Sequence, residues 1–108
     1  MRGSRVSYPP SSSGASFLVV AISSNVTLQT NTYSLVDTSA ARSLTMPTPV
    51  SGAVFYVKDK TFQAQTNNIT FLQSGSVKIE GVAGSYVLSA NGGAIMFVSD
   101  GTDWFIMN

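Results

Sequence analysis

Five carboxylates are the side chains of this 108-residue chain that could do acid–base chemistry: Asp37, Asp59, Glu80, Asp100 and Asp103. Histidine and cysteine are absent, which removes the commonest general acid–base group, the thiolate nucleophile and most transition-metal ligands. A glycosidase-like hydrolase would need two carboxylates facing each other at about 5 to 10 Å, and the local sequence predicts separate turns. Serines are plentiful, but no Gly-Xaa-Ser-Xaa-Gly elbow occurs. We expect no enzyme, no metal and no cofactor, with a small carboxylate-dependent hydrolase as a distant alternative.

Polar loop motifs allow both a ligand-binding and a structural interpretation. The segment 99–103 (SDGTD) resembles half of a calcium site, but Asp-Gly is a favoured turn dipeptide and calcium requires six to eight oxygen ligands. Asn67 and Asn68, like Asn91, could offer amides to a sugar, although asparagine is also a favoured turn residue. Strand aromatics could stack on a glycan, but they are more often core or interface anchors. We interpret these motifs mainly as turns and core, and keep the three asparagines as candidate ligand-facing loop residues.

The charge balance argues against nucleic acids and membranes as partners. The chain is 44% apolar and only 10% charged, with a net charge of +1. Its only basic concentration is Arg2 and Arg5, which cannot neutralise a row of phosphates. The longest apolar run, 17–22, is six residues, far below the roughly 18 to 20 that cross a bilayer. Residues 1–16 do not resemble a secretory signal, since a Tyr-Pro-Pro and a serine tract replace the apolar region.

Two segments with different compositions follow one another along the chain. Residues 1–16 are rich in Ser, Pro and Arg and cannot bury enough apolar area to fold alone, so we expect an extended arm that docks on a partner. Residues 17–108 alternate short strand-like runs with turn residues, which predicts an all-β body of short antiparallel strands in a compact β-sandwich or barrel-like arrangement. Strands are predicted at 17–22, 26–29, 33–36, 43–46, 53–58, 69–72, 77–79, 86–89, 94–99 and 104–107.

The last two predicted strands form a hairpin around Asp100-Gly101 and carry apolar residues at consecutive positions, hence on both faces. Covering both faces needs a second sheet or a neighbouring subunit, and we expect this short chain to use the subunit. An unpaired 17–22 strand would also invite association. The predicted interface residues are Phe17, Val19, Ile95, Phe97, Trp104 and Ile106.

Residues 26–108, about three-quarters of the chain, resemble a β-rich module that recurs in bacteriophage tail-fibre, head-fibre and capsid-decoration proteins. The family order is a strand ending in Leu-Pro, a Gly-containing strand ending in Lys-Asp, then Asn-Ile-Thr, Ile-Asp-Gly, and Ser-Asp-Gly before an aromatic. Here Met46 replaces the Leu, Glu80 replaces the Asp, and Phe62-Gln63 stands where a Gly-Asn turn is usual. The matching pieces are 43–47 (SLTMP), 52–59 (GAVFYVKD), 66–71 (TNNITF), 79–81 (IEG), 86–88 (YVL) and 98–104 (VSDGTDW).

The resemblance implies an intertwined homotrimer on the virion surface, with N-termini fixed to the particle and the β body projecting outward. Neither heptads nor a period of 20 to 50 residues occurs, so a head fibre or capsid-decoration protein fits better than a long tail fibre. The partner would be the major capsid protein or another virion structural protein, reached through an anchoring arm that includes Arg2, Arg5, Tyr8, Pro9 and Pro10. The alternative is a tail-fibre tip that binds a receptor or host-surface glycan through loops at Asn67, Asn68 and Asn91.

Overall fold

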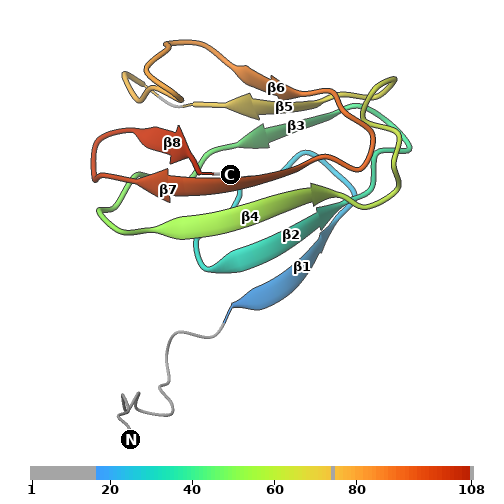
Figure 1. Ribbon diagram of the computed structural model, residues 1–108, viewed down its shortest axis with the longest axis horizontal. Helices are drawn as coiled ribbons and strands as arrows, with labels where there is room; N and C mark the ends of the chain where they lie inside the picture. The colour runs from blue at the N-terminus through green and yellow to red at the C-terminus, as the bar shows by residue number, and fades with distance from the viewer. Residues whose placement is uncertain (1–16, 74, 108) are drawn as a thin grey trace, which may run out of the picture.

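The computed structural model describes residues 17–73 and 75–107, and all regular secondary structure in them is β-strand (Figure 1). The predicted all-β fold is confirmed, and no helix able to span a membrane occurs within these ranges. Eight of the ten predicted segments contain strands, whereas 26–29 and 77–79 form only isolated bridges through Thr27 and Ile79. The strands are β1 (Leu18–Ile22), β2 (Thr32–Val36), β3 (Arg42–Thr45), β4 (Val54–Asp59), β5 (Ile69–Leu72), β6 (Tyr86–Leu88), β7 (Ala94–Ser99) and β8 (Trp104–Ile106).

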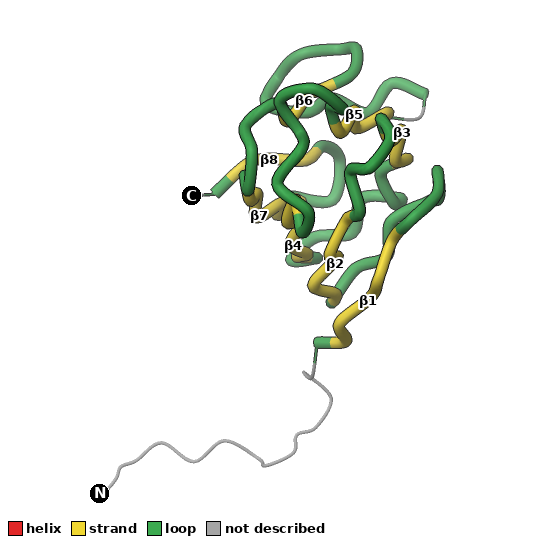
Figure 2. Tube along the Cα trace, turned by 90° about the vertical axis from the view of Figure 1, so that its right-hand side faces the viewer, coloured by secondary structure: helices red, strands yellow, loops and turns green. Residues whose placement is uncertain are grey.

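Two mixed sheets face each other with the core between them (Figure 2). The large sheet has the strand order β1-β2-β4-β7-β8, and the small sheet has the order β3-β5-β6. Strand alternation gives each sheet one buried and one outward face, as in β4, where Phe55, Val57 and Asp59 are buried and the residues between them are half-buried. The predicted β-sandwich architecture follows from this pairing of faces. The predicted arm residues Arg2, Arg5, Tyr8, Pro9 and Pro10 lie outside the described residues.

The first half of the chain winds alternately through the two sheets. It passes from β1 in the large sheet to residues 26–28, a short segment beside β3 of the small sheet that we call the rung. It then continues through β2, β3, β4 and β5, and each step crosses to the opposite sheet. The rung is held beside β3 by Leu28 N–H donating to Thr45 O at 2.8 Å and Thr45 N–H donating to Val26 O at 3.0 Å. We call residues 18–72 the three-turn roll.

Strand direction in the roll differs from the prediction. The pairs β1–β2, β2–β4 and β3–β5 are parallel, while β4–β7, β7–β8 and β5–β6 are antiparallel. Parallel partners arise because the chain returns to each sheet only after crossing through the other, and therefore enters it in the same direction. The antiparallel strands β6, β7 and β8 then extend the far edge of each sheet. The predicted C-terminal hairpin around Asp100-Gly101 is confirmed as β7–β8.

The core is centred on four aromatic rings. Phe55 stacks on Phe97 with ring centroids 5.1 Å apart and meets Trp104 edge-on at 5.0 Å, and Phe71 of the small sheet meets Phe97 edge-on at 5.0 Å. All four side chains have 0% exposure. The Trp104 indole N–H donates to Pro47 O at 3.0 Å, so its polar atom is satisfied within the core.

These positions correct the predicted subunit interface. Ile95, Phe97 and Trp104 are placed in the core of a single chain with 4, 0 and 0% exposure, and Ile106 packs half-buried against the same core. The prediction assumed that a chain this short had no second sheet to cover β7 and β8. The segments that alternate with the large-sheet strands along the chain form this second sheet. It covers the inner face of β7 and β8, which therefore needs no neighbouring subunit.

Candidate functional site

The carboxylates organise turns. Asp37 accepts from Ser39 N–H at 2.8 Å, Glu80 from Ile106 N–H at 2.7 Å, and Asp103 from Lys78 N–H at 2.9 Å. Asp100 accepts from the N–H groups of residues 102 and 103, both at 2.9 Å, so Asp100 and Asp103 share the β7–β8 turn instead of occupying separate turns as predicted. Across 17–73 and 75–107, no group of three metal-binding side chains comes together. Hydrogen bonding within turns also lowers the pKa of Asp37 and of Asp100 below its ordinary value.

Asp59 is the one fully buried carboxylate, with 0% exposure, at the end of β4. Its Oδ1 accepts from the Thr38 hydroxyl at 2.6 Å and Phe62 N–H at 3.0 Å, and its Oδ2 accepts from Ala64 N–H at 2.9 Å and Gly92 N–H at 3.0 Å. Burial raises the pKa of this carboxyl, but the four donors together lower it by more, so the net pKa lies below the ordinary value. With every lone-pair direction occupied from within the protein, Asp59 joins three loops and has no free oxygen for a substrate.

The outward face of the large sheet is a continuous apolar surface, which we call the apolar outer face. One row crosses β1, β2, β4 and β7 and ends at Met107, just after β8; its only polar side-chain atoms are two tyrosine hydroxyls. Val19 lies beside Tyr33, Tyr33 beside Tyr56 and Tyr56 beside Met96, and Met107 N–H donates to Met96 O at 2.9 Å. A second row comprises Val54, Val98 and Phe105. Among the outward positions of these five strands, as described, Lys58 is the one charged residue.

An aromatic cluster covers one half of this face. Phe17 lies 5.1 Å from Tyr33 and 5.9 Å from Tyr56, and the two tyrosine rings stack at 5.1 Å, all measured between ring centroids. Val19, Tyr33 and Met107 are exposed by 68, 43 and 56%. The amine of Lys58 folds back to donate to Gly92 O and lies 5.4 Å from the Phe62 ring centroid. The one charge at the described outward strand positions is therefore engaged at one end of the face.

The structure thus divides the six predicted interface residues. Phe17 and Val19 lie on the apolar outer face, whereas the residues chosen from β7 and β8 point inward. The outward residues of β7 and β8 are Met96, Val98 and Phe105, and Tyr33 of β2 and Tyr56 of β4 lie on the same face; none of these five was among the predicted interface residues. Strand alternation separates the two faces of β4, but in β7 and β8 every residue of 95–98 and 104–107 is apolar, so only the pairing register shows which ones face outward.

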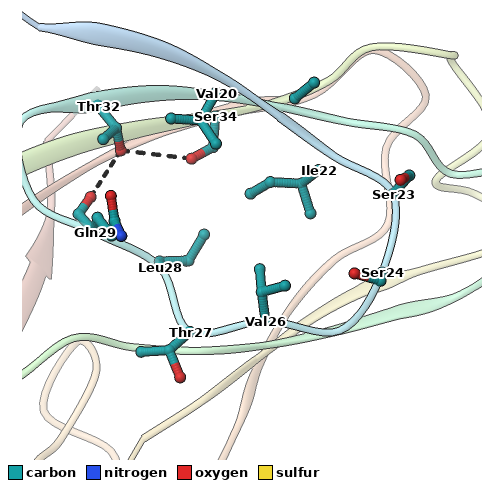
Figure 3. A pocket seen from close by; sticks show the side chains of 11 residues that line it. Val20, Ile22, Ser23, Ser24, Val26, Thr27, Leu28, Gln29, Thr32 and Ser34 are labelled. Atoms are coloured by element: carbon teal, nitrogen blue, oxygen red, sulfur yellow. Dashed lines mark hydrogen bonds between the residues drawn. The ribbon is translucent and has the colours of Figure 1, made fainter.

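A groove opens where the roll begins, between β1 and β2 on one side and the 23–29 connection on the other (Figure 3). It has a volume of about 260 Å³, and the side chains of Ile22, Val26 and Leu28 point into it. Thr32 at its inner end donates to Gln29 O at 2.7 Å. None of its lining residues carries a charge. The groove can hold a neutral, partly apolar group but offers it no acid or base.

The predicted ligand-facing asparagines lie in two neighbouring loops and are engaged in holding them. The amide N–H₂ group of Asn67 donates to Thr38 O at 2.8 Å, and that of Asn68 donates to Ala64 O at 2.6 Å. The side-chain oxygen of Asn91 accepts from Gln65 N–H at 2.8 Å, which joins the two loops. Each of the three side chains therefore uses at least one polar atom in a hydrogen bond that holds its loop in place.

A scan against protein-family models finds no match for this chain, and a search of curated proteins finds no match either.

Proposed function

We propose that this chain is a non-enzymatic structural module of a bacteriophage particle, a homotrimeric capsid-decoration or head-fibre protein on the virion surface. In this proposal residues 1–16 anchor it to the major capsid protein or another virion structural protein, and the β body projects outward. The proposal rests on the resemblance of residues 26–108 to phage fibre and decoration modules. It is supported by the backbone φ angles of this chain at two positions where its sequence departs from the family pattern.

The observation that carries the proposal is the backbone at two departures from the family pattern. Phe62, where the pattern has glycine, adopts a φ of 62°, the left-handed conformation that glycine tolerates best. Glu80, where the pattern has Asp before Gly, has a φ of 54° and is followed by Gly81 at 76°. Two successive positive φ values make the tight turn for which Asp-Gly is favoured. At both positions the backbone thus adopts conformations that Gly and Asp-Gly favour, which supports the resemblance.

The other pieces that match the family pattern also have structural roles, in the core and in turns. The 43–47 piece ends at Pro47, whose carbonyl receives the indole N–H of Trp104, and the 52–59 piece ends at the buried Asp59. The 98–104 piece makes the β7–β8 turn. Motif residues that serve turns and core are typical of a structural module, in contrast to an enzyme, whose motif residues gather at a cleft.

Particle binding tests the proposal. The full chain should co-sediment with particles of the phage that encodes it after the resident copies are stripped, and a chain that begins at Ala15 should stay in solution while keeping its fold. Retained binding by the shortened chain would refute anchoring by residues 1–16. Failure of the full chain to bind any component of the particle would refute the virion role.

The alternative, a receptor- or glycan-binding fibre tip, relies on the loops at Asn67, Asn68 and Asn91. The hydrogen bonds that these side chains make within and between their two loops, and from Asn67 to the loop that contains Thr38, weaken this alternative. A glycan array separates the two functions, because specific binding that is lost on Asn91→Ala, with the melting temperature unchanged, would favour the adhesin.

A further inference from the structure

We infer that the apolar outer face of the large sheet is the surface through which copies of this chain associate, and that its occupant is the same face of a second copy. This inference rests on the proposed function, because it names the self-contact surface of the proposed oligomer. Its residues, however, can be tested without any particle.

The small sheet provides an internal comparison. On its outward side, Ser43 lies beside Thr70 and Thr70 beside Val87, while Thr45 lies beside Leu72. Hydroxyl-bearing residues thus form most of that face, as expected for a sheet that faces water. The large sheet presents Val, Tyr and Met at the corresponding outward positions. Both sheets belong to one chain in one solvent, so the apolar face of the large sheet requires a cover that the small sheet does not.

The chemistry of the apolar outer face favours a second copy of this chain as the partner that covers it. Lys58 is the single charge at its described outward strand positions, and its amine is already bonded to Gly92 O, so a strongly charged partner would find no complementary group. A neutral apolar face is complementary to another of its kind, and obligate homo-oligomer interfaces are the most apolar class. The stacked Tyr33 and Tyr56 rings lie between Val19 and Met96 in their row and contact Phe17, and such aromatic residues within an interface are often its hot spots.

The size of the face follows from the strand geometry. Five strands that together contain 25 residues, at about 3.3 Å per residue and about 4.8 Å between strands, give a flat projection of roughly 400 Å². Side-chain relief and the flanking Phe17 and Met107 add accessible area to this projection, and a standard interface buries roughly 800 Å² per partner, so the face matches an interface at the small end of the range. Three such faces turned toward one axis would form a closed prism that hides all of them. Phe17, the first described residue, lies on this face, so three N-terminal segments would start side by side and could bind a particle together.

Solution mass by light scattering, measured on full-length chains over a concentration series, tests the inference. Val19→Lys combined with Tyr33→Lys places two charges on the apolar outer face at positions exposed by 68 and 43%. The matched control, Leu72→Lys with Val87→Lys, places two charges on the outward side of the small sheet at positions exposed by 39 and 46%. Circular dichroism melts report whether each variant remains folded. Met107→Lys, at the opposite edge of the face, replaces the double variant if that one does not fold.

We expect the wild type and the control to have the mass of three chains, and the face variant to fall threefold to the mass of one folded chain. A wild type that is monomeric at every concentration would overturn the inference, as would a folded face variant that keeps the wild-type mass. A wild-type mass of two chains that the face variant halves would support the surface and refute the trimer. Association through this face without particle binding would refute only the virion role.

Discussion

Replacing Asp59 by asparagine removes one oxygen acceptor from a site in which four groups donate to the carboxylate. In one orientation of the new amide, its N–H₂ group faces Ala64 N–H and Gly92 N–H, which can only donate. In the other orientation it faces Phe62 N–H and the Thr38 hydroxyl, which can turn to accept. Asp100→Asn is the matched control. Only Oδ1 of Asp100 accepts the two backbone N–H groups of its turn, and the oxygen of an amide can take over both bonds.

The magnitude follows from the lost bonds. A hydrogen bond to a charged group contributes about 1.5 to 3 kcal/mol, so one or two lost bonds amount to roughly 1.5 to 6 kcal/mol. Removing a buried charge offsets part of this loss, because the desolvation penalty of the ion disappears with it. We expect Asp59→Asn to lower the free energy of unfolding by about 2 to 4 kcal/mol, a large share of the roughly 5 to 15 kcal/mol of a typical domain.

Urea unfolding at neutral pH measures the difference, and its pH dependence checks the cause. The pKa of Asp59 is lowered in the folded state, so the folded protein binds fewer protons at this site than the unfolded chain. The stabilisation by ionised Asp59 is therefore fully present above the ordinary aspartate pKa of 3.8, which applies to the unfolded chain, and is lost as the pH falls through the lower folded-state pKa. The gap between wild type and Asp59→Asn should stay constant from about pH 5 to 8 and narrow below about pH 4.

Two results would refute this reasoning. A loss under about 1 kcal/mol would mean that the four donors find other partners or water. A gap that widens on acidification would mean that folding raises the pKa of Asp59 instead of lowering it. Asp100→Asn should change the unfolding free energy far less than Asp59→Asn, and an equal effect would show that the loss reflects a general property of Asp-to-Asn changes.

Three further predictions concern the core and the turns. Phe97→Ala should cost about 3 to 5 kcal/mol in urea unfolding, because it empties a fully buried site between two sheets; a loss below about 2 kcal/mol would contradict the ring packing. Gly92→Ala should lower the melting temperature more than Gly52→Ala, although both glycines have positive φ (72° and 84°), because a Cβ at 92 would lie 2.6 Å from the Phe62 ring while nothing lies within 4 Å at 52. The single tryptophan, Trp104, has 0% exposure, so native fluorescence should resist acrylamide quenching, and strong quenching before unfolding would contradict its burial.

Local signals were sufficient to predict the strands. Alternating or β-branched runs bounded by Gly, Pro and Asn located β1 to β8, and Asp100-Gly101 identified the only hairpin that was predicted. Each of these signals depends only on residues that are close together in the chain, so a single sequence is enough to recognise it. The two predicted strands that became isolated bridges, 26–29 and 77–79, also have strand-like residues, but each lies in a connection where the chain pairs at only one or two positions.

Parallel pairing was not predictable because its partners are distant and irregularly spaced. Val20 pairs with Ser34 fourteen residues later, and Ser34 pairs with Val57 twenty-three residues later. Successive turns of the roll therefore differ in length, and no repeat appears in the sequence. Sequence distance also explains why the predicted interface residues of β7 and β8 lie in the core. Both faces of these strands are apolar, and the face that becomes covered depends on strands from distant parts of the chain.

The winding of the three-turn roll also determines the order in which this protein can be built. Only β5–β6 and β7–β8 can form as hairpins between consecutive antiparallel strands, and both lie in the second half of the chain. During synthesis, β1 to β3 leave the ribosome before β4, β5 and β7 exist to cover their apolar sides. Because loop closure over long distances slows folding to milliseconds or seconds, the N-terminal half remains uncovered for longest. We therefore expect premature contact between chains to be most frequent while this half is uncovered.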